Sequence, residues 1–200
     1  MPGKKIGLFG GTFDPPHFGH MLIAQEALHE CKLDEIWFIP VSTPPHKERD
    51  VTPGYARLEM LVRAIEDEPK FYVSDAELKR SGRSYTVDTV KHFAETYPSH
   101  EFFFIIGGDM IESLGEWKDI ETILSLVTFI GVDRGGHTDA SPHYKDRVQH
   151  LDLIQVDFSS TKIRERVQES KPIRYMVPDK VDTYIQEGGL YGSKTSVRTR

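Results

Sequence analysis

The sequence contains a single cysteine, Cys31, in 200 residues, which excludes a disulfide bond within the chain. Proteins of reducing compartments use cysteine in this way, and we therefore expect a cytoplasmic protein. No apolar run approaches the roughly 20 residues of a membrane-spanning helix, so no membrane partner is expected. The N-terminal residues also lack the hydrophobic segment of a secretory signal peptide.

Positive charge is scarce as well, because 25 Lys and Arg residues face 31 Asp and Glu residues, a formal net charge of −6. A protein that binds nucleic acid along its surface needs a basic face. The acidic balance therefore argues against a nucleic-acid partner. Any phosphate-binding site must be a local positive pocket on an acidic molecule.

The length and the hydrophobic content of 38% are sufficient for one compact domain with a sizeable core. No internal repeat and no low-complexity segment divides the chain. We expect residues 1–192 to form this domain and residues 193–200, which carry three basic groups, to form a loose C-terminal tail. The sequence leaves open whether the chain assembles as a homo-oligomer.

Short apolar runs alternate along the chain with segments of helical periodicity. The runs predict strands at residues 5–9, 35–40, 71–73, 102–106, 129–132 and 153–156. The periodic segments predict helices around residues 21–31, 53–67, 85–97, 109–114, 120–126, 161–169 and 179–187. In the second helix, Thr52 is the expected N-cap, and Leu58, Leu61, Val62 and Ile65 form the apolar face. This alternation predicts an α/β protein, a Rossmann-like open parallel sheet with helices on both faces.

Three unusual segments follow expected strands, namely residues 10–20, 107–109 and 159–161. In open parallel sheets, ligands bind beyond the carboxyl ends of the strands, near the point where the strand order reverses. We therefore expect the three segments to lie on one rim of the sheet. This expectation depends only on topology.

The segment from Gly10 to His20 is a strand-to-helix turn near the N-terminus. Gly10 and Gly11 would let the backbone turn sharply and approach a ligand closely. His17 and His20 are three residues apart, so they share a face if the first helical turn includes them. The N–H groups and partial positive charge of a helix N-terminus suit a phosphate. Asp14 would either orient a histidine or cap the turn.

Other interpretations of the two histidines need weighing. His17 and His20 could simply cap the helix or lie on the surface. A zinc site needs three or four ligands, and Cys31 is too far along the helix to join them easily. We therefore expect no metal site built from protein side chains.

A second helix start follows at Ser159, Ser160 and Thr161, with Arg164 one turn later. Hydroxyl groups at a helix N-terminus act as caps and, with the nearby N–H groups, suit a phosphate. The fork of Arg N–H donors matches phosphate oxygens. The alternative is an ordinary N-cap followed by solvated basic residues.

The His-x-Gly-His pattern at residues 17–20 resembles the nucleotidylyltransferase superfamily. The longer string Gly-Gly-Thr-Phe-Asp-Pro-Pro-His-x-Gly-His, with Ser-Ser-Thr-x-Ile-Arg at 159–164 and Pro-x-x-Val-x-x-Tyr-Ile at 178–185, is similar to the nicotinate mononucleotide adenylyltransferases. The resemblance covers residues 5–191. It implies an enzyme of NAD biosynthesis that transfers the adenylyl group of ATP to nicotinate mononucleotide, with Mg²⁺ bound through the triphosphate. The products would be deamido-NAD and pyrophosphate.

The resemblance also implies roles for residues. It makes His17, His20 and Arg164 catalytic, and Asp109 the partner of the adenosine ribose, although Asp109 could instead cap a helix. The implied ATP contacts are Gly10, Gly11, Thr12, Phe13, His20, Gly107, Asp109, Ser159, Ser160, Thr161 and Arg164.

On the acceptor side, the resemblance implies contacts from Lys47, Ser84, Tyr85, Thr86, Trp117 and Arg134. Thr86 would cap a helix whose N–H groups hold the pyridine carboxylate, which an amide would not match. The flat face of Trp117 suits a cationic pyridinium ring, although Trp117 could also be a packing residue. Lys47 and Arg134 would neutralise phosphate charge, although a lone surface Lys is more often solvated.

Two rival functions remain at this point. Enzymes with pantetheine-phosphate or cytidylyl acceptors share the fold, and residues 84–89 with Trp117 argue against them. A nucleotide-binding sensor with an inactive site is the second rival. The intact His17, His20 and Arg164 argue against a sensor, because it need not keep both phosphate-binding motifs.

Overall fold

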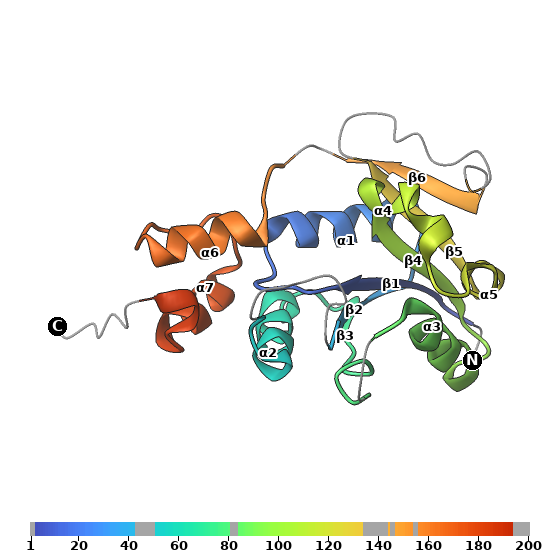
Figure 1. Ribbon diagram of the computed structural model, residues 1–200, viewed down its shortest axis with the longest axis horizontal. Coiled ribbons are helices and arrows are strands. Elements are labelled where there is room, and N and C mark those ends of the chain that lie inside the picture. Colours follow the sequence, from blue (N-terminus) through green and yellow to red (C-terminus); the bar gives the residue numbers. More distant parts are fainter. Residues whose placement is uncertain are drawn as a thin grey trace.

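The structure, a computed structural model, describes residues 3–42, 51–80, 84–133, 144, 147–153 and 156–193. Its sheet has six parallel strands in the order β3-β2-β1-β4-β5-β6 (Figure 1). The strands are β1 Lys5–Gly11, β2 Glu35–Pro40, β3 Phe71–Val73, β4 Glu101–Gly107, β5 Val127–Asp133 and β6 Val148–Asp152. The predicted open parallel sheet is confirmed.

Helices cover both faces of the sheet, as expected. They are α1 Phe18–Glu30, α2 Gly54–Ile65, α3 Thr86–Thr96, α4 Gly108–Glu112, α5 Ile120–Leu126, α6 Ser160–Gln168 and α7 Asp179–Glu187, with short 3₁₀ turns η1 Leu114–Glu116 and η3 Leu190–Gly192. Buried residues of α1 and α2 share one hydrophobic cluster, and those of α3, α4 and α5 share another. Within the described residues, no helix has the length and apolar character needed to cross a membrane.

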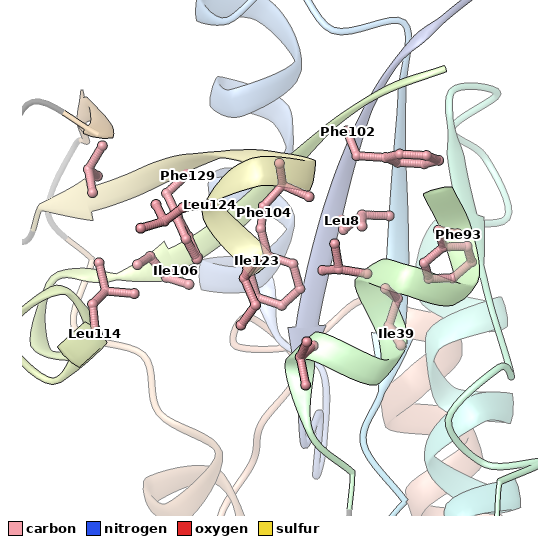
Figure 2. Packing of buried hydrophobic residues seen from close by; sticks show 14 of the residues in the cluster. Leu8, Ile39, Phe93, Phe102, Phe104, Ile106, Leu114, Ile123, Leu124 and Phe129 are labelled. Atoms are coloured by element: carbon pink, nitrogen blue, oxygen red, sulfur yellow. The ribbon is translucent and has the colours of Figure 1, made fainter. Parts of the chain in front are cut away.

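The apolar residues of strand β4 contribute side chains to both clusters. Phe102 and Phe104 join the cluster of α3 and α5, whereas Phe103 and Ile105 join the cluster of α1 and α2. Successive strand side chains point to opposite faces, so a strand buried on both sides is apolar throughout. Figure 2 shows the cluster of α3 and α5, in which the ring centroids of Phe102 and of Phe93 in α3 lie 6.1 Å apart.

A third cluster joins the C-terminal helices to the sheet domain. Its buried members are Met60, Ile163, Val167, Ile173, Val177, Val181 and Ile185, which come from α2, α6, α7 and the segment between the last two. The backbone N–H of Phe18 also donates to the carbonyl of Met176 at 3.0 Å. Figure 1 shows α6 and α7 as a group beside α1 and α2. The segment between α6 and α7 is therefore held against the first residue of the helix that follows β1.

Two predictions about secondary structure are wrong. The sixth strand is β6, upstream of the predicted residues 153–156, because Phe129 of β5 pairs with Val148 and not with the later apolar run. Helix α2 starts at Gly54 with Pro53 at the N-cap, not Thr52.

The buried face of α2 agrees with the prediction only in part, because Leu61 and Ile65 are buried as expected but two other positions differ. Arg57 and Met60 are buried, whereas Val62 is 46% exposed and Leu58 is only partly buried. A charged residue occupies a core position here, which apolar periodicity does not register. Residues 194–200 of the expected tail lie outside the described residues.

We expect Ile185→Ala to lower the free energy of unfolding of the whole domain by about 2–5 kcal/mol, because a buried side chain is replaced by a cavity. Ile185 is fully buried in the third cluster. Urea unfolding should show one transition, with circular dichroism and tryptophan fluorescence coincident. Val62→Ala, on an exposed face, should change stability by at most about 0.5 kcal/mol. Separate melting of the C-terminal helices would contradict this prediction.

Candidate active site

The candidate site lies at the carboxyl ends of β1 and β4. These two strands are neighbours in the middle of the sheet, and the chain continues from them toward opposite edges. In such sheets this reversal opens a crevice for a ligand. The turn from Thr12 to His17 follows β1 there, and α4 begins at Gly108 directly after β4.

Phe13, and not a glycine, makes the turn after β1. Its φ is 50°, whereas Gly10 and Gly11 remain in the strand, paired with Ile39 and Pro40. A Cβ on Gly11 would lie 2.8 Å from the Phe13 ring, so this glycine permits close packing. The Phe13 side chain is 2% exposed. Phe13 is therefore a core residue, and its contact with ATP stays a prediction.

His17 and His20 face each other at the start of α1. Their rings are stacked, with centroids 3.7 Å apart and planes inclined by 20°, so the expected shared face is observed. The backbone N–H of His17 donates to Nδ1 of His20 at 3.2 Å. A neutral His20 ring then carries its proton on Nε2, which makes Nε2 a hydrogen-bond donor. The Phe13 ring lies edge-on to His20 at 5.0 Å and fixes it from the core side.

The start of α6 packs against the turn after β1. Ser159 is the N-cap, and its Oγ accepts from the N–H of Lys162 at 3.2 Å. Ser160 Oγ donates to the carbonyl of Pro15 at 2.9 Å, and Arg164 Nη1 donates to the carbonyl of Asp14 at 2.8 Å. The fold thus brings together two motifs that are about 140 residues apart in sequence.

One further hydrogen bond at this junction lies within α6. Arg164 Nη2 donates to Thr161 Oγ1 at 3.1 Å, which holds the guanidinium along the first turn of α6. At the end of β4, Gly107 is the N-cap of α4. Asp109 lies within α4, and its side chain is outside what the structure describes.

Three of the residues predicted for the acceptor side, Ser84, Tyr85 and Thr86, lie at the N-terminus of α3. Tyr85 is the N-cap and Thr86 is the first helical residue, so the prediction that Thr86 caps the helix is off by one. The backbone N–H of Ser42, which follows β2, donates to Ser84 Oγ at 3.4 Å. Lys118 Nζ lies 4.2 Å from the centre of the Tyr85 ring.

Trp117 is half-buried against the sheet. Its ring lies edge-on to Phe104 and Phe129, at 6.1 and 5.8 Å. Trp117 is therefore a packing residue, as one of the two interpretations expected. Stacking of Trp117 on a pyridine ring stays a prediction. Lys47 and Arg134 lie outside the described residues.

A network behind α3 holds its first turns in place. Thr89 Oγ1 donates to Glu77 Oε1 at 2.6 Å, and Arg80 contacts both residues. Thr89 and Glu77 are buried. The loop after β3 therefore fixes the helix whose N-terminus faces the candidate acceptor side.

Arg57 is a residue that sequence reasoning missed. It is 1% exposed, and its guanidinium donates to the carbonyls of Thr12, Val41 and Thr52, each at 2.8 Å, and of Ser42 at 3.3 Å. Arg57 therefore joins the turn after β1 to the end of β2 and the start of α2. Its spacing of four and eight residues from the buried Leu61 and Ile65 is the signal that could have found it.

Among the residues with described positions, no three His, Cys, Asp or Glu side chains gather into a group that could hold a metal ion. The donors around the turn are imidazole, guanidinium, hydroxyl and backbone N–H groups, a set that suits phosphate oxygens.

This chain is similar to known proteins in sequence. The sequence pattern of the cytidylyltransferase-like family matches residues 8–166. A protein of Shouchella clausii named "Probable nicotinate-nucleotide adenylyltransferase" is 53% identical over 190 residues, covering 94% of this chain and 97% of that protein. The Bacillus subtilis protein named "Nicotinate-nucleotide adenylyltransferase" is 48% identical over 191 residues, covering 95% of this chain and 100% of that protein.

Solved structures share the fold. Plasmodium falciparum nicotinic acid mononucleotide adenylyltransferase complexed with NaAD matches with a TM-score of 0.78 at 22% identity, covering 94% of this chain and 97% of that one. The same protein complexed with APC gives the same values. At this identity the likeness supports the fold alone.

We expect Arg57→Met to lower the free energy of unfolding by about 3 kcal/mol or more, because it removes a buried charged group that donates to four partly buried carbonyl groups. Urea unfolding measures the change. Arg63→Met in the same helix is the matched control, because Arg63 pairs with Glu59 at a half-exposed position. The control should lose no more than about 1 kcal/mol. Equal losses in the two variants would contradict the prediction, because the hydrogen bonds of Arg57 would then contribute no more to stability than the ion pair of Arg63.

Proposed function

Because this chain belongs to the cytidylyltransferase-like family, and within it to the nicotinate-nucleotide adenylyltransferases, we propose that it transfers the adenylyl group of ATP to nicotinate mononucleotide. A phosphate oxygen of the mononucleotide attacks the α-phosphorus of ATP. The bond from that phosphorus to the oxygen shared with the β-phosphate breaks, and pyrophosphate leaves with the electron pair. The products are deamido-NAD and pyrophosphate, in a step of NAD biosynthesis.

The observation that carries this proposal is the junction of α6 with the turn before α1. It places Arg164 on the turn that leads into the stacked His17 and His20. The nucleophile is already an anion, so the reaction needs no strong base. Positioning and stabilisation of charge on the phosphates supply most of the catalysis.

Each group has a role set by its geometry. His20, with its proton on Nε2, donates to a phosphate oxygen, and His17 supports its orientation through the backbone and the stacked ring. The N-terminus of α1 adds its N–H groups and partial positive charge. Arg164 stabilises negative charge as pyrophosphate leaves. The glycines Gly10, Gly11 and Gly107, with Thr12, Ser159, Ser160 and Thr161, line the ATP side in this proposal.

We also propose that the N-terminus of α3 binds the carboxylate of the pyridine ring. A helix of 11 residues starts at Thr86 and presents backbone N–H groups there. A carboxylate accepts from them and interacts favourably with the helix dipole, whereas a carboxamide carries no charge. Tyr85 and Trp117 provide aromatic surface next to this end, and Lys47 and Arg134 complete the acceptor side.

The reaction proceeds in this proposal with Mg²⁺, which neutralises charge on the triphosphate when it is bound. The nucleotide supplies most of its ligands, in agreement with the donor set of the turn, which has imidazole, guanidinium and hydroxyl groups. A cytoplasmic location fits a chain whose one cysteine, Cys31, is buried and reduced.

The first test measures pyrophosphate release from ATP and Mg²⁺ with nicotinate mononucleotide and with nicotinamide mononucleotide in parallel. We expect rapid release with the acid and at least about tenfold lower kcat/KM with the amide, because the amide loses a charge-assisted contact. Equal use of both would keep adenylyl transfer and discard the carboxylate site at α3. Release only with a pantetheine phosphate or a cytidylyl acceptor would contradict the proposed substrate. ATP binding without release would favour a sensor.

The second test is His20→Ala. We expect kcat to fall by roughly 10²–10³, since the variant loses one well-aimed donor to the developing charge. His29→Ala is the matched control, because His29 lies in the last turn of the same helix with a side chain that is 83% exposed. Circular dichroism establishes that both variants are folded. A folded His20→Ala enzyme with full activity would disprove the role of His20.

A further inference from the structure

Tyr191 lies in an unusual backbone conformation close to the C-terminal end of the described chain. Its φ is 58°, in the left-handed region that side chains disfavour, and Gly189 and Gly192 on either side have φ values of 60° and 78°. A conformation of this kind persists only where the surrounding structure requires it, and it is a reason to look for a function. The ring of Tyr191 packs against the third cluster, with Leu190.

The hydroxyl of Tyr191 reaches the turn after β1. Its Oη donates to Oδ1 of Asp14 at 2.7 Å, across 177 residues of sequence, and lies 3.9 Å from Sδ of Met60. Asp14 is 1% exposed. Burial, followed by the Asp14 carboxylate, raises the pKa of the Tyr191 phenol far above its usual range. The phenol therefore stays protonated and remains the donor in this hydrogen bond.

Asp14 is the point at which the C-terminal elements meet the catalytic turn. Its carboxylate accepts from Tyr191, and its backbone carbonyl accepts from Arg164 at 2.8 Å. Three residues later the chain reaches His17, the N-cap of α1. A change in the position of Asp14 therefore moves the histidines relative to Arg164.

We propose that Tyr191 is a positioning residue for adenylyl transfer, which holds Asp14 and thereby sets the distance between the histidine turn and Arg164. This inference rests on the proposed function. Tyr191 is partly buried against the third cluster, and it acts through Asp14. Its loss should affect the rate more than substrate binding, because a small displacement of well-aimed groups weakens stabilisation of the transition state most.

The test compares Tyr191→Phe with Tyr184→Phe. Tyr184 is a matched control in α7, where its ring faces the guanidinium of Arg63 at 4.9 Å. We expect Tyr191→Phe to lower kcat about tenfold or more, the usual effect of losing a hydrogen bond to a charged group, and to change KM for ATP by no more than about twofold. Tyr184→Phe should keep both constants.

The variant Asp14→Asn and the double variant that combines it with Tyr191→Phe test whether Tyr191 affects kcat through Asp14. If Tyr191 acts through Asp14, the double variant loses no more activity than the more affected single variant, whereas independent roles would multiply. If Tyr191→Phe does not fold, Asp14→Asn alone must show the same fall in kcat with an unchanged KM. Additive losses, or a folded Tyr191→Phe enzyme with wild-type kcat, would overturn the proposal.

A readout that is independent of activity separates this inference from the proposed function. The NMR signals of the His17 and His20 rings, assigned by comparison with single His→Asn variants, should shift in Tyr191→Phe and stay in place in Tyr184→Phe. An inactive wild-type protein would contradict the proposed function, and the histidine signals would still test the link from Tyr191. Unchanged signals in both variants would exclude the link.

Discussion

The turn between β1 and α1 presents backbone carbonyl groups that require donors from other parts of the chain. Buried carbonyl groups are almost always hydrogen-bonded, and a turn has no ladder to provide partners. Side chains of α2 and α6 supply them here, in the pairs Arg57 with Thr12, Arg164 with Asp14 and Ser160 with Pro15. The conformation of the catalytic turn therefore depends on helices that lie far away in the sequence.

This arrangement gives some residues two tasks. Arg164 stabilises the turn through the Asp14 carbonyl and carries positive charge at the edge of the proposed phosphate site. His17 forms the N-cap of α1 and orients His20 through its backbone. The same contacts hold the turn and direct its donors toward the proposed phosphate site, and donors fixed in this way favour electrostatic catalysis.

Local patterns predicted much of the fold. The bounds of β2, β3, α5 and α7 agree with the structure, because each lies between clear breaks and carries a simple apolar pattern. The sixth strand and half of the predicted buried face of α2, namely Leu58 and Val62, were wrong for a physical reason. An edge strand is selected by its pairing with β5, and Arg57 is buried because four carbonyl groups surround it. The strand pairing is not visible in a window of sequence, and the only local signal for Arg57 is its helical spacing from Leu61 and Ile65.

The sequence by itself determined the parallel α/β class, the two phosphate-type motifs, the family and hence the chemistry, because each rests on residues that are close together in the chain. Only the tertiary structure decided which side chains support the site. Phe13 lies in the core beneath His20, Trp117 packs on the sheet, and Tyr191 reaches Asp14 across 177 residues. A hydrogen bond of this kind depends on the position of two surfaces after folding, and no periodicity or motif encodes that distance.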